Sequence, residues 1–323
     1  MSEKSPFTKD DITYALFDID PAAYYQERYA YNNVMGVVAN ESRATRNTLV
    51  YQKAHYLYEA LRRCLSDTAN NPVKVLEVGC GSGTFGARLK HFFPEIELFG
   101  VDMSSSCIEI AKQNGFDHAV TYDVVQGLPY ADNEFDFIYT MDFFGHVEFR
   151  SKDRMIAELS RITKPGGYGF HGIESGFIDY LNCNPKNPDD IVRKYVYMEG
   201  HVGVETLEDI LDRFAKHFEI VQAFPFPIRP LLNISNILNS RFWGEEFCSA
   251  FADIDNPTSR VAADLVMGWF NKYLTDQMLQ IYGNELTQSR VADTGNPALN
   301  RFIDTLLQGC GFSMTTLRKK PQA

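Results

Sequence analysis

The segment VLEVGCGSGTFGARL, residues 75–89, joins a short apolar run to a cluster of glycines. Its letters from Gly81 to Gly86 fit G-x-G-x-x-G, the fingerprint of a loop that binds the pyrophosphate of a dinucleotide. The same letters hold a second series, Gly79, Gly81 and Gly83. Either series suits a backbone that turns sharply and approaches a ligand closely, because glycine has no side chain to prevent it. The glycines alone therefore leave two ligand classes open.

Two acids near this loop differ in what they indicate about the ligand. Asp102 ends the next apolar run, 19 residues after Gly83, and an acid at that place binds ribose hydroxyls in either ligand class. Glu77 precedes the loop directly. A pyrophosphate held at a helix N-terminus would have an unfavourable neighbour in this carboxylate. Glu77 therefore favours a ligand that carries an ammonium group and a sulfonium.

The rest of the chain predicts an α/β fold. Apolar runs typical of strands lie at residues 73–78, 97–101, 118–122, 134–141, 168–173, 218–224 and 311–320. Helical patterns lie between them, at 84 onward, 104–114, 152–163 and 205–216, and a further amphipathic helix is expected at 42–66. Strands that alternate with helices in this way form a parallel sheet covered on both faces. Ligands then bind outside the carboxyl ends of the strands.

Five stretches resemble, in order, the motifs of the class I S-adenosylmethionine-dependent methyltransferases. They are VLEVGCGSG (75–83), GVDMS (100–104), YDVVQGLPYADNEFDFIYTMDFFGHV (122–147), ELSRITKPGGYGFHGIE (158–174) and GHVGVETLEDILDRFAKHFEIV (200–221). The resemblance covers about 73–224 and 311–320. Each stretch alone is a weak signal, but five in the right order are a strong one for fold and cofactor.

The resemblance implies a Rossmann-like, seven-stranded and mostly parallel sheet with helices on both faces. In the organisation that follows, residues 1–70 form an N-terminal helical lid, and 71–224 plus 311–323 form the methyltransferase core. Residues 225–310 form a helical insertion before the last strand, because a structureless loop of that length is implausible. This insertion is expected to be either a cap over the substrate or the interface of a homodimer.

The resemblance also implies the residues that bind S-adenosylmethionine. These are Gly79, Cys80, Gly81 and Gly83 along the methionine portion, Glu77 at its amino end, Asp102 at the ribose, Met103, Asp123 and Val124 around adenine, and Met141 under the transferable methyl. Tyr25, from a tyrosine-rich segment of the lid, is a further candidate, since tyrosine faces stabilise a sulfonium by cation–π attraction. Simple packing is the alternative for both Met141 and Tyr25.

The reaction implied is methyl transfer to an O-, N- or C-nucleophile of a small molecule, such as a secondary metabolite or a lipid-like compound, and it needs a base only if the acceptor must lose a proton. The catalytic candidates are His146, Glu174 and His171, all near the predicted ends of strands. His146 could instead orient its loop, and His171 could pack within the sheet. For His201 we expect a role in steadying a loop.

The composition limits which partners, metals and locations we expect for the protein. The net charge of -11 argues against nucleic acid. The six cysteines form no C-x-x-C and none lies close to a histidine in sequence, so we expect no metal site and a reducing, cytoplasmic location. No apolar run is long enough to cross a membrane. Two alternatives stay open: an NAD(P)-dependent oxidoreductase that uses Gly81–Gly86, and a non-catalytic subunit that binds the cofactor.

Overall fold

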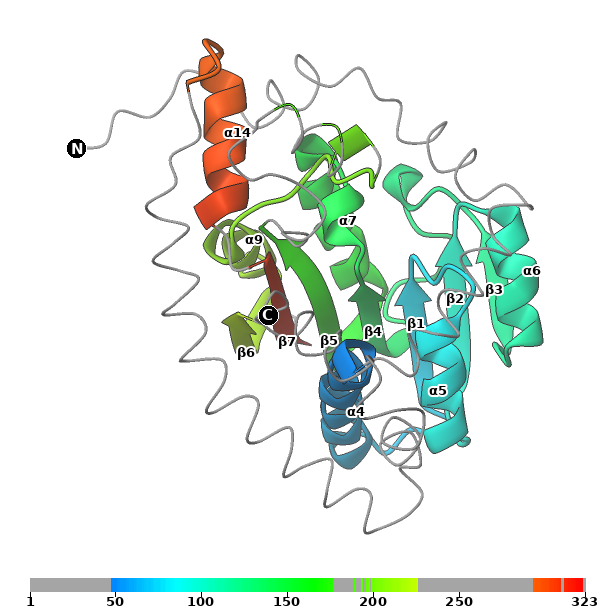
Figure 1. Ribbon diagram of the computed structural model, residues 1–323. Coiled ribbons are helices and arrows are strands. Elements are labelled where there is room, and N and C mark those ends of the chain that lie inside the picture. The colour runs from blue at the N-terminus through cyan, green and yellow to red at the C-terminus, as the bar shows by residue number, and fades with distance from the viewer. Residues whose placement is uncertain are drawn as a thin grey trace.

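A seven-stranded sheet forms the centre of the molecule (Figure 1). The computed structural model describes residues 48–176, 189, 193, 196, 197, 199–225, 293–308 and 311–321. The strands are β1 (Lys74–Val78), β2 (Glu97–Asp102), β3 (His118–Thr121), β4 (Phe135–Met141), β5 (Thr163–Ser175), β6 (Phe218–Pro225) and β7 (Gly311–Lys319). Their order is β3-β2-β1-β4-β5-β7-β6, and β7 alone runs antiparallel to its neighbours. The predicted seven-stranded, mostly parallel sheet is confirmed.

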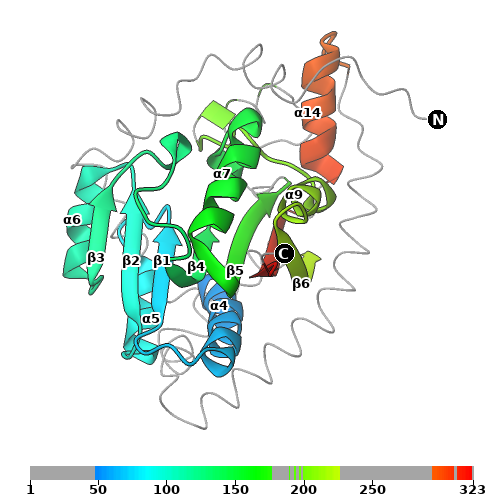
Figure 2. The same ribbon diagram turned by 180° about the vertical axis from the view of Figure 1, so that it is seen from behind.

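Helices cover both faces of the sheet, as Figures 1 and 2 show from opposite sides. One face packs against α4 (Thr48–Asp67), α5 (Thr84–Phe92) and α6 (Ser105–Gln113), and the other against α7 (Phe149–Ile162) and α9 (Leu207–Phe214). The helix α14 (Pro297–Gln308) precedes β7. The strand β1 shows why two layers form: Val75 belongs to the first core cluster and Leu76 to the second. Successive side chains point to opposite faces, so a strand with apolar side chains on both faces needs cover on both sides.

Two element boundaries differ from the sequence prediction by three residues or more. β5 begins at Thr163 rather than at residue 168, because Phe135 of β4 pairs with Thr163 before the register shifts and Phe137 pairs with Tyr168. The helix α7 begins at Phe149 rather than at residue 152, and the Phe149 side chain is buried. The sequence signal failed at both places because pairing and burial extend an element past its regular pattern.

Large parts of the predicted lid and insertion lie outside the described residues, as does Tyr25. Of the lid, α4 is described. Its side chains Ala54, Leu57 and Leu61 are buried in the first core cluster, so this helix belongs to the layer that covers the sheet. Among the described helices, none has the length and apolar character that a membrane crossing requires.

Candidate active site

The loop after β1 turns on the second glycine series. Gly79, Gly81 and Gly83 have φ angles of 73°, 52° and 81°, a left-handed region that side chains disfavour. Gly86 lies one turn inside α5, where an added Cβ would lie 2.1 Å from Cζ of Phe116. Gly86 is therefore a packing glycine, and the G-x-G-x-x-G match joins residues with two different roles.

The backbone of the loop is held where it leaves β1 and is open at Gly81. The N–H groups of Gly79 and Cys80 donate to the carbonyl of Val101 at 2.8 and 3.1 Å, which ties the loop to the end of β2. A Cβ added at Gly79 would meet the ring of Phe143 at 2.3 Å, whereas one added at Gly81 would find no atom within 4 Å. Gly81 therefore faces open space at the carboxyl edge of the sheet, where a ligand can approach the backbone.

Asp102 joins the two loops that border this space. Its carboxylate accepts hydrogen bonds from the N–H of Gly81 and from the N–H of Ser104, both at 2.9 Å. Ser104 in turn caps α6, since its hydroxyl accepts from the N–H of Cys107 at 3.2 Å. Met103, between them, is half-buried. The acid at the end of the second strand is thus held at the rim by short backbone contacts.

Glu77 is a buried carboxylate beneath the loop. It is 2 % exposed, and Oε2 accepts a hydrogen bond from the hydroxyl of Tyr139 at 2.8 Å. Burial, followed by the charges of Glu77 and Asp102, raises the pKa of the Cys80 thiol. Cys80 therefore stays protonated and packs as an apolar group. A buried acid beneath the loop suits a cationic ligand group nearby.

The residues expected around adenine and methyl are also at the edge of the sheet. Asp123 begins a short 3-10 helix, Val124–Gln126, and its side chain accepts from the N–H of Val125 at 3.1 Å. Val124 is buried in the second core cluster. Met141 ends β4, and its sulfur lies 3.0 Å from the position of a Cβ built on Gly172. Because Met141 is part of the first core cluster, packing accounts for this side chain without a ligand.

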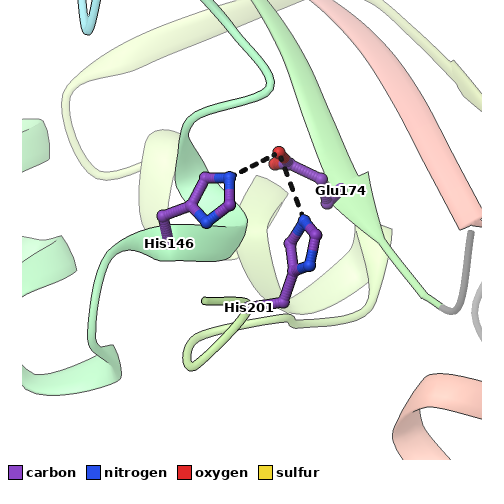
Figure 3. A group of neighbouring side chains, drawn as sticks. All are labelled: His146, Glu174 and His201. Carbon is purple, nitrogen blue, oxygen red and sulfur yellow. Dashed lines mark ion pairs between the residues drawn. The ribbon is translucent and has the colours of Figure 1, made fainter. Parts of the chain in front are cut away.

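Three residues from separate segments meet near the carboxyl ends of β4 and β5 (Figure 3). His146 ends the 3-10 helix Phe144–His146, Glu174 lies near the end of β5, and His201 lies in the loop before α9. The Nε2 atoms of His146 and His201 lie 3.6 and 3.9 Å from Oε1 of Glu174. The two imidazole rings stack with centroids 4.5 Å apart. We call these three residues the His-Glu-His cluster.

Close backbone contact brings the loop of His201 to the loop of His146. The N–H of Gly203 donates to the carbonyl of Gly145 at 2.9 Å. A Cβ on Gly203 would lie 1.8 Å from the carbonyl oxygen of Val147, so no other residue fits there without movement. The cluster depends on this approach, because His201 lies in the same loop as Gly203 and not on a strand of the sheet.

Glu174 is the most deeply buried member of the cluster. Its side chain is 1 % exposed; Oε2 accepts from the N–H of Gly145 at 3.0 Å, while Oε1 accepts no hydrogen bond from any residue that the structure describes. Burial, and then the charge of Asp142, raises the pKa of this carboxyl to about 7. The positive charge of Lys53 opposes this shift.

Lys53 and Asp142 are site neighbours that the sequence reasoning missed. The ammonium of Lys53 lies 2.5 Å from a carboxylate oxygen of Asp142 and 4.0 Å from the centre of the Phe312 ring. Asp142 follows β4 with a φ of 51°, which is uncommon for a residue with a side chain. The one available signal was a lysine beside the apolar positions Ala54 and Leu57 of α4.

His171 is brought to the core and not to the cluster. Its ring stacks on Phe214 of α9 with centroids 4.9 Å apart, and Nδ1 lies 3.0 Å from the hydroxyl oxygen of Thr140. Burial lowers the pKa of His171 to about 3, so the ring is neutral. These contacts fit the packing alternative for His171 and give it no open path to an acceptor.

Known proteins match this part of the chain. A family described as a methyltransferase domain matches residues 75–167. The match runs from β1 to the first residues of β5. The demethylmenaquinone methyltransferase of Thermotoga maritima is 34 % identical over 97 residues, which are 30 % of this chain and 42 % of that protein. The norajmaline N-methyltransferase of Rauvolfia serpentina is 31 % identical over 121 residues, 35 % of this chain and 40 % of that protein.

A solved structure extends the likeness beyond the methyltransferase domain. Phosphoethanolamine N-methyltransferase 2 of Haemonchus contortus, in complex with S-adenosyl-L-methionine, aligns with a TM-score of 0.52 at 14 % identity, over 94 % of this chain and 60 % of that one. At this identity the likeness concerns the fold alone. The sequence alignments span about two fifths of the length of these relatives, so they leave most of each relative unmatched.

Proposed function

We propose that this chain transfers the methyl group of S-adenosylmethionine to a small-molecule acceptor. One observation carries the proposal: the left-handed glycines 79, 81 and 83 surround an open position that Asp102 borders and Glu77 underlies. The relatives support it, because their names describe methylation of small molecules, demethylmenaquinone and norajmaline. The acceptor itself is proposed only as a class.

On the cofactor side, Asp102 would bind the ribose. A carboxylate offers about four lone-pair sites, and two loop N–H groups occupy two of them here. The two ribose hydroxyls would donate to this carboxylate. Glu77 would offset the ammonium and sulfonium charges, while Cys80 and the glycines line the methionine chain. Met103, Asp123 and Val124 would surround adenine, and Met141 would lie beneath the methyl group.

On the acceptor side, His146 and Glu174 would contact the methyl acceptor. His146 follows β4, which lies next to β1 in the sheet, and Glu174 lies near the end of β5, which lies next to β4. The sulfonium donor is already activated, so the protein mainly holds two reactants in attack geometry, which can supply roughly 7–11 kcal/mol in ideal cases. His171 has no part in this arrangement because it contacts Thr140 and Phe214.

Calorimetry with S-adenosylhomocysteine and, separately, NADH tests the proposal. We expect S-adenosylhomocysteine to bind one site per chain and NADH to show no heat. The opposite result would favour an oxidoreductase that uses Gly81–Gly86. Binding of S-adenosylhomocysteine without methylation of any compound in a broad acceptor panel, followed by mass spectrometry, would favour a non-catalytic subunit.

Three further expectations stay predictions. They are a cytoplasmic location, a surface that does not bind nucleic acid, and a homodimer formed through residues 225–310. Light scattering on the purified chain tests the last of these.

A further inference from the structure

The orientation of the two imidazoles in the His-Glu-His cluster determines which ring nitrogens carry protons. Nδ1 of His146 lies 3.2 Å from the carbonyl oxygen of Gly200, and a carbonyl oxygen can only accept, so this nitrogen carries the proton. Nδ1 of His201 lies 3.4 Å from a carboxylate oxygen of Glu199. In a neutral ring with its proton on Nδ1, each histidine has a lone pair on Nε2.

Both Nε2 atoms lie close to a third acceptor, a carboxylate oxygen. The two Nε2 atoms face Oε1 of Glu174, an oxygen that is buried and accepts no hydrogen bond in the described part of the chain (Figure 3). Acceptors that face one another in a buried site repel unless a positive centre lies between them. A metal ion or a proton at this point relieves the repulsion.

We propose that His146, Glu174 and His201 bind a first-row divalent metal ion, through Nε2, Oε1 and Nε2. The three ligand atoms lie within 4.8 Å of one another, and ligands at about 2.1 Å around a tetrahedral ion lie about 3.4 Å apart. Binding therefore needs the contacts of 3.6 and 3.9 Å to shorten, and the stacked rings to turn so that both Nε2 lone pairs point at the ion. Two imidazoles and one carboxylate are the ligand set of catalytic zinc and of non-haem iron sites.

The surroundings of the cluster have the form of an outer shell around a metal. Histidines that bind metals donate the other ring N–H to a carboxylate or a backbone carbonyl, which fixes the ring. Glu199 and Gly200 supply one of each. On Glu174, the N–H of Gly145 holds Oε2 and leaves Oε1 for the ion.

This proposed site differs from the absence of a metal that the cysteine and histidine spacing predicted. The ligands lie 28 and 27 residues apart along the chain, far outside the spacings of metal motifs, so no pattern marks them. With an ion bound, His146 is a ligand and not a free base. Three protein ligands leave a coordination position for water or an acceptor oxygen, and this last step rests on the proposed function.

Binding of Co²⁺ and Zn²⁺ to the chelator-stripped full chain tests the site. We expect one Co²⁺ per chain, with visible absorption bands typical of four- or five-coordinate cobalt, and Zn²⁺ that displaces it, following the usual order of affinities. Zn²⁺ should also raise the melting temperature, because it binds the folded chain. The variants Glu174→Gln and His201→Gln should each lose the cobalt spectrum. Glu199→Gln should weaken binding about 10–100-fold.

His118→Gln is the matched control, because His118 and Glu97 form a His–carboxylate pair at 3.0 Å on the exposed edge of the sheet. It should bind Co²⁺ as the wild type does. A wild type that binds neither ion overturns the proposal and indicates an ion pair of protonated histidine with Glu174. Cobalt spectra that persist in both ligand variants also overturn it. Binding of S-adenosylhomocysteine to the stripped wild type tests the proposed function separately.

Discussion

Replacement of Asp102 by alanine tests how the carboxylate serves the cofactor site. In the structure the side chain accepts two backbone N–H groups at 2.9 Å, from Gly81 and Ser104, and the proposal adds two ribose hydroxyls. A hydrogen bond to a charged group contributes about 1.5–3 kcal/mol. Loss of even one such contact weakens binding roughly 10–150-fold. We therefore expect Asp102→Ala to weaken S-adenosylhomocysteine binding at least about tenfold.

Asp102→Asn should fall between the alanine variant and the wild type. The amide keeps one acceptor oxygen but carries no charge and offers an NH₂ group toward the N–H of Gly81 or Ser104. Isothermal calorimetry with S-adenosylhomocysteine measures both variants, and urea unfolding shows that each is folded. A folded Asp102→Ala chain with wild-type affinity would refute the assignment of Asp102 to the ribose.

Asp117→Ala is a matched control at the opposite edge of the sheet. Asp117 also accepts a backbone N–H, from Leu98 at 2.8 Å, and pairs with Lys90 at 2.6 Å. Its backbone and lysine contacts outweigh burial and lower its pKa, so it is charged at neutral pH. Its loss should reduce the free energy of unfolding and leave the affinity for S-adenosylhomocysteine unchanged. Equal losses of affinity in both alanine variants would mean that the effect is a general loosening of the sheet.

Two further predictions concern packing residues. Burial lowers the pKa of His171 in the folded chain to about 3, from the ordinary 6.5. Its contribution to the free energy of unfolding is complete above pH 6.5 and falls as the pH drops toward 3. The loss is about 2 kcal/mol at about pH 5, so urea unfolding of His171→Phe should lack this part of the acid decline; parallel curves for both proteins would contradict the assignment. Gly86→Ala should lower the free energy of unfolding by about 1–3 kcal/mol, because its Cβ would lie 2.1 Å from Phe116. A rise in the melting temperature, as expected for Gly→Ala at an uncrowded helix position, would show that Phe116 moves aside without a loss of stability.

Local patterns along the chain were enough for the fold and for the cofactor loop. The alternation of strands and helices follows from apolar periodicity, because a strand buried on both faces must be mostly apolar whatever its neighbours are. The loop of glycines 79, 81 and 83 could be chosen over the dinucleotide fingerprint because Glu77 lies beside it in sequence. The structure gives the same answer through backbone angles, since all three glycines are left-handed.

Contacts between distant segments were not available from such patterns. Lys53 reaches Asp142 across 89 residues only because α4 packs on the sheet beside β4 and β5. The sequence marked His171 as a catalytic candidate by its place near a strand end. Which face of β5 the ring occupies, and that Phe214 of α9 stacks upon it, depends on how the helices are laid over the sheet.

The sequence by itself therefore determined the α/β architecture, the turn that faces the cofactor and the acid at the end of β2, because each depends on residues close together in the chain. Tertiary structure decided the acceptor side. His146, Glu174 and His201 meet because β5 lies next to β4 and because Gly203 lets one loop touch another. Strand order and close backbone approach are set by the packing of the whole sheet, and no short stretch of sequence encodes them.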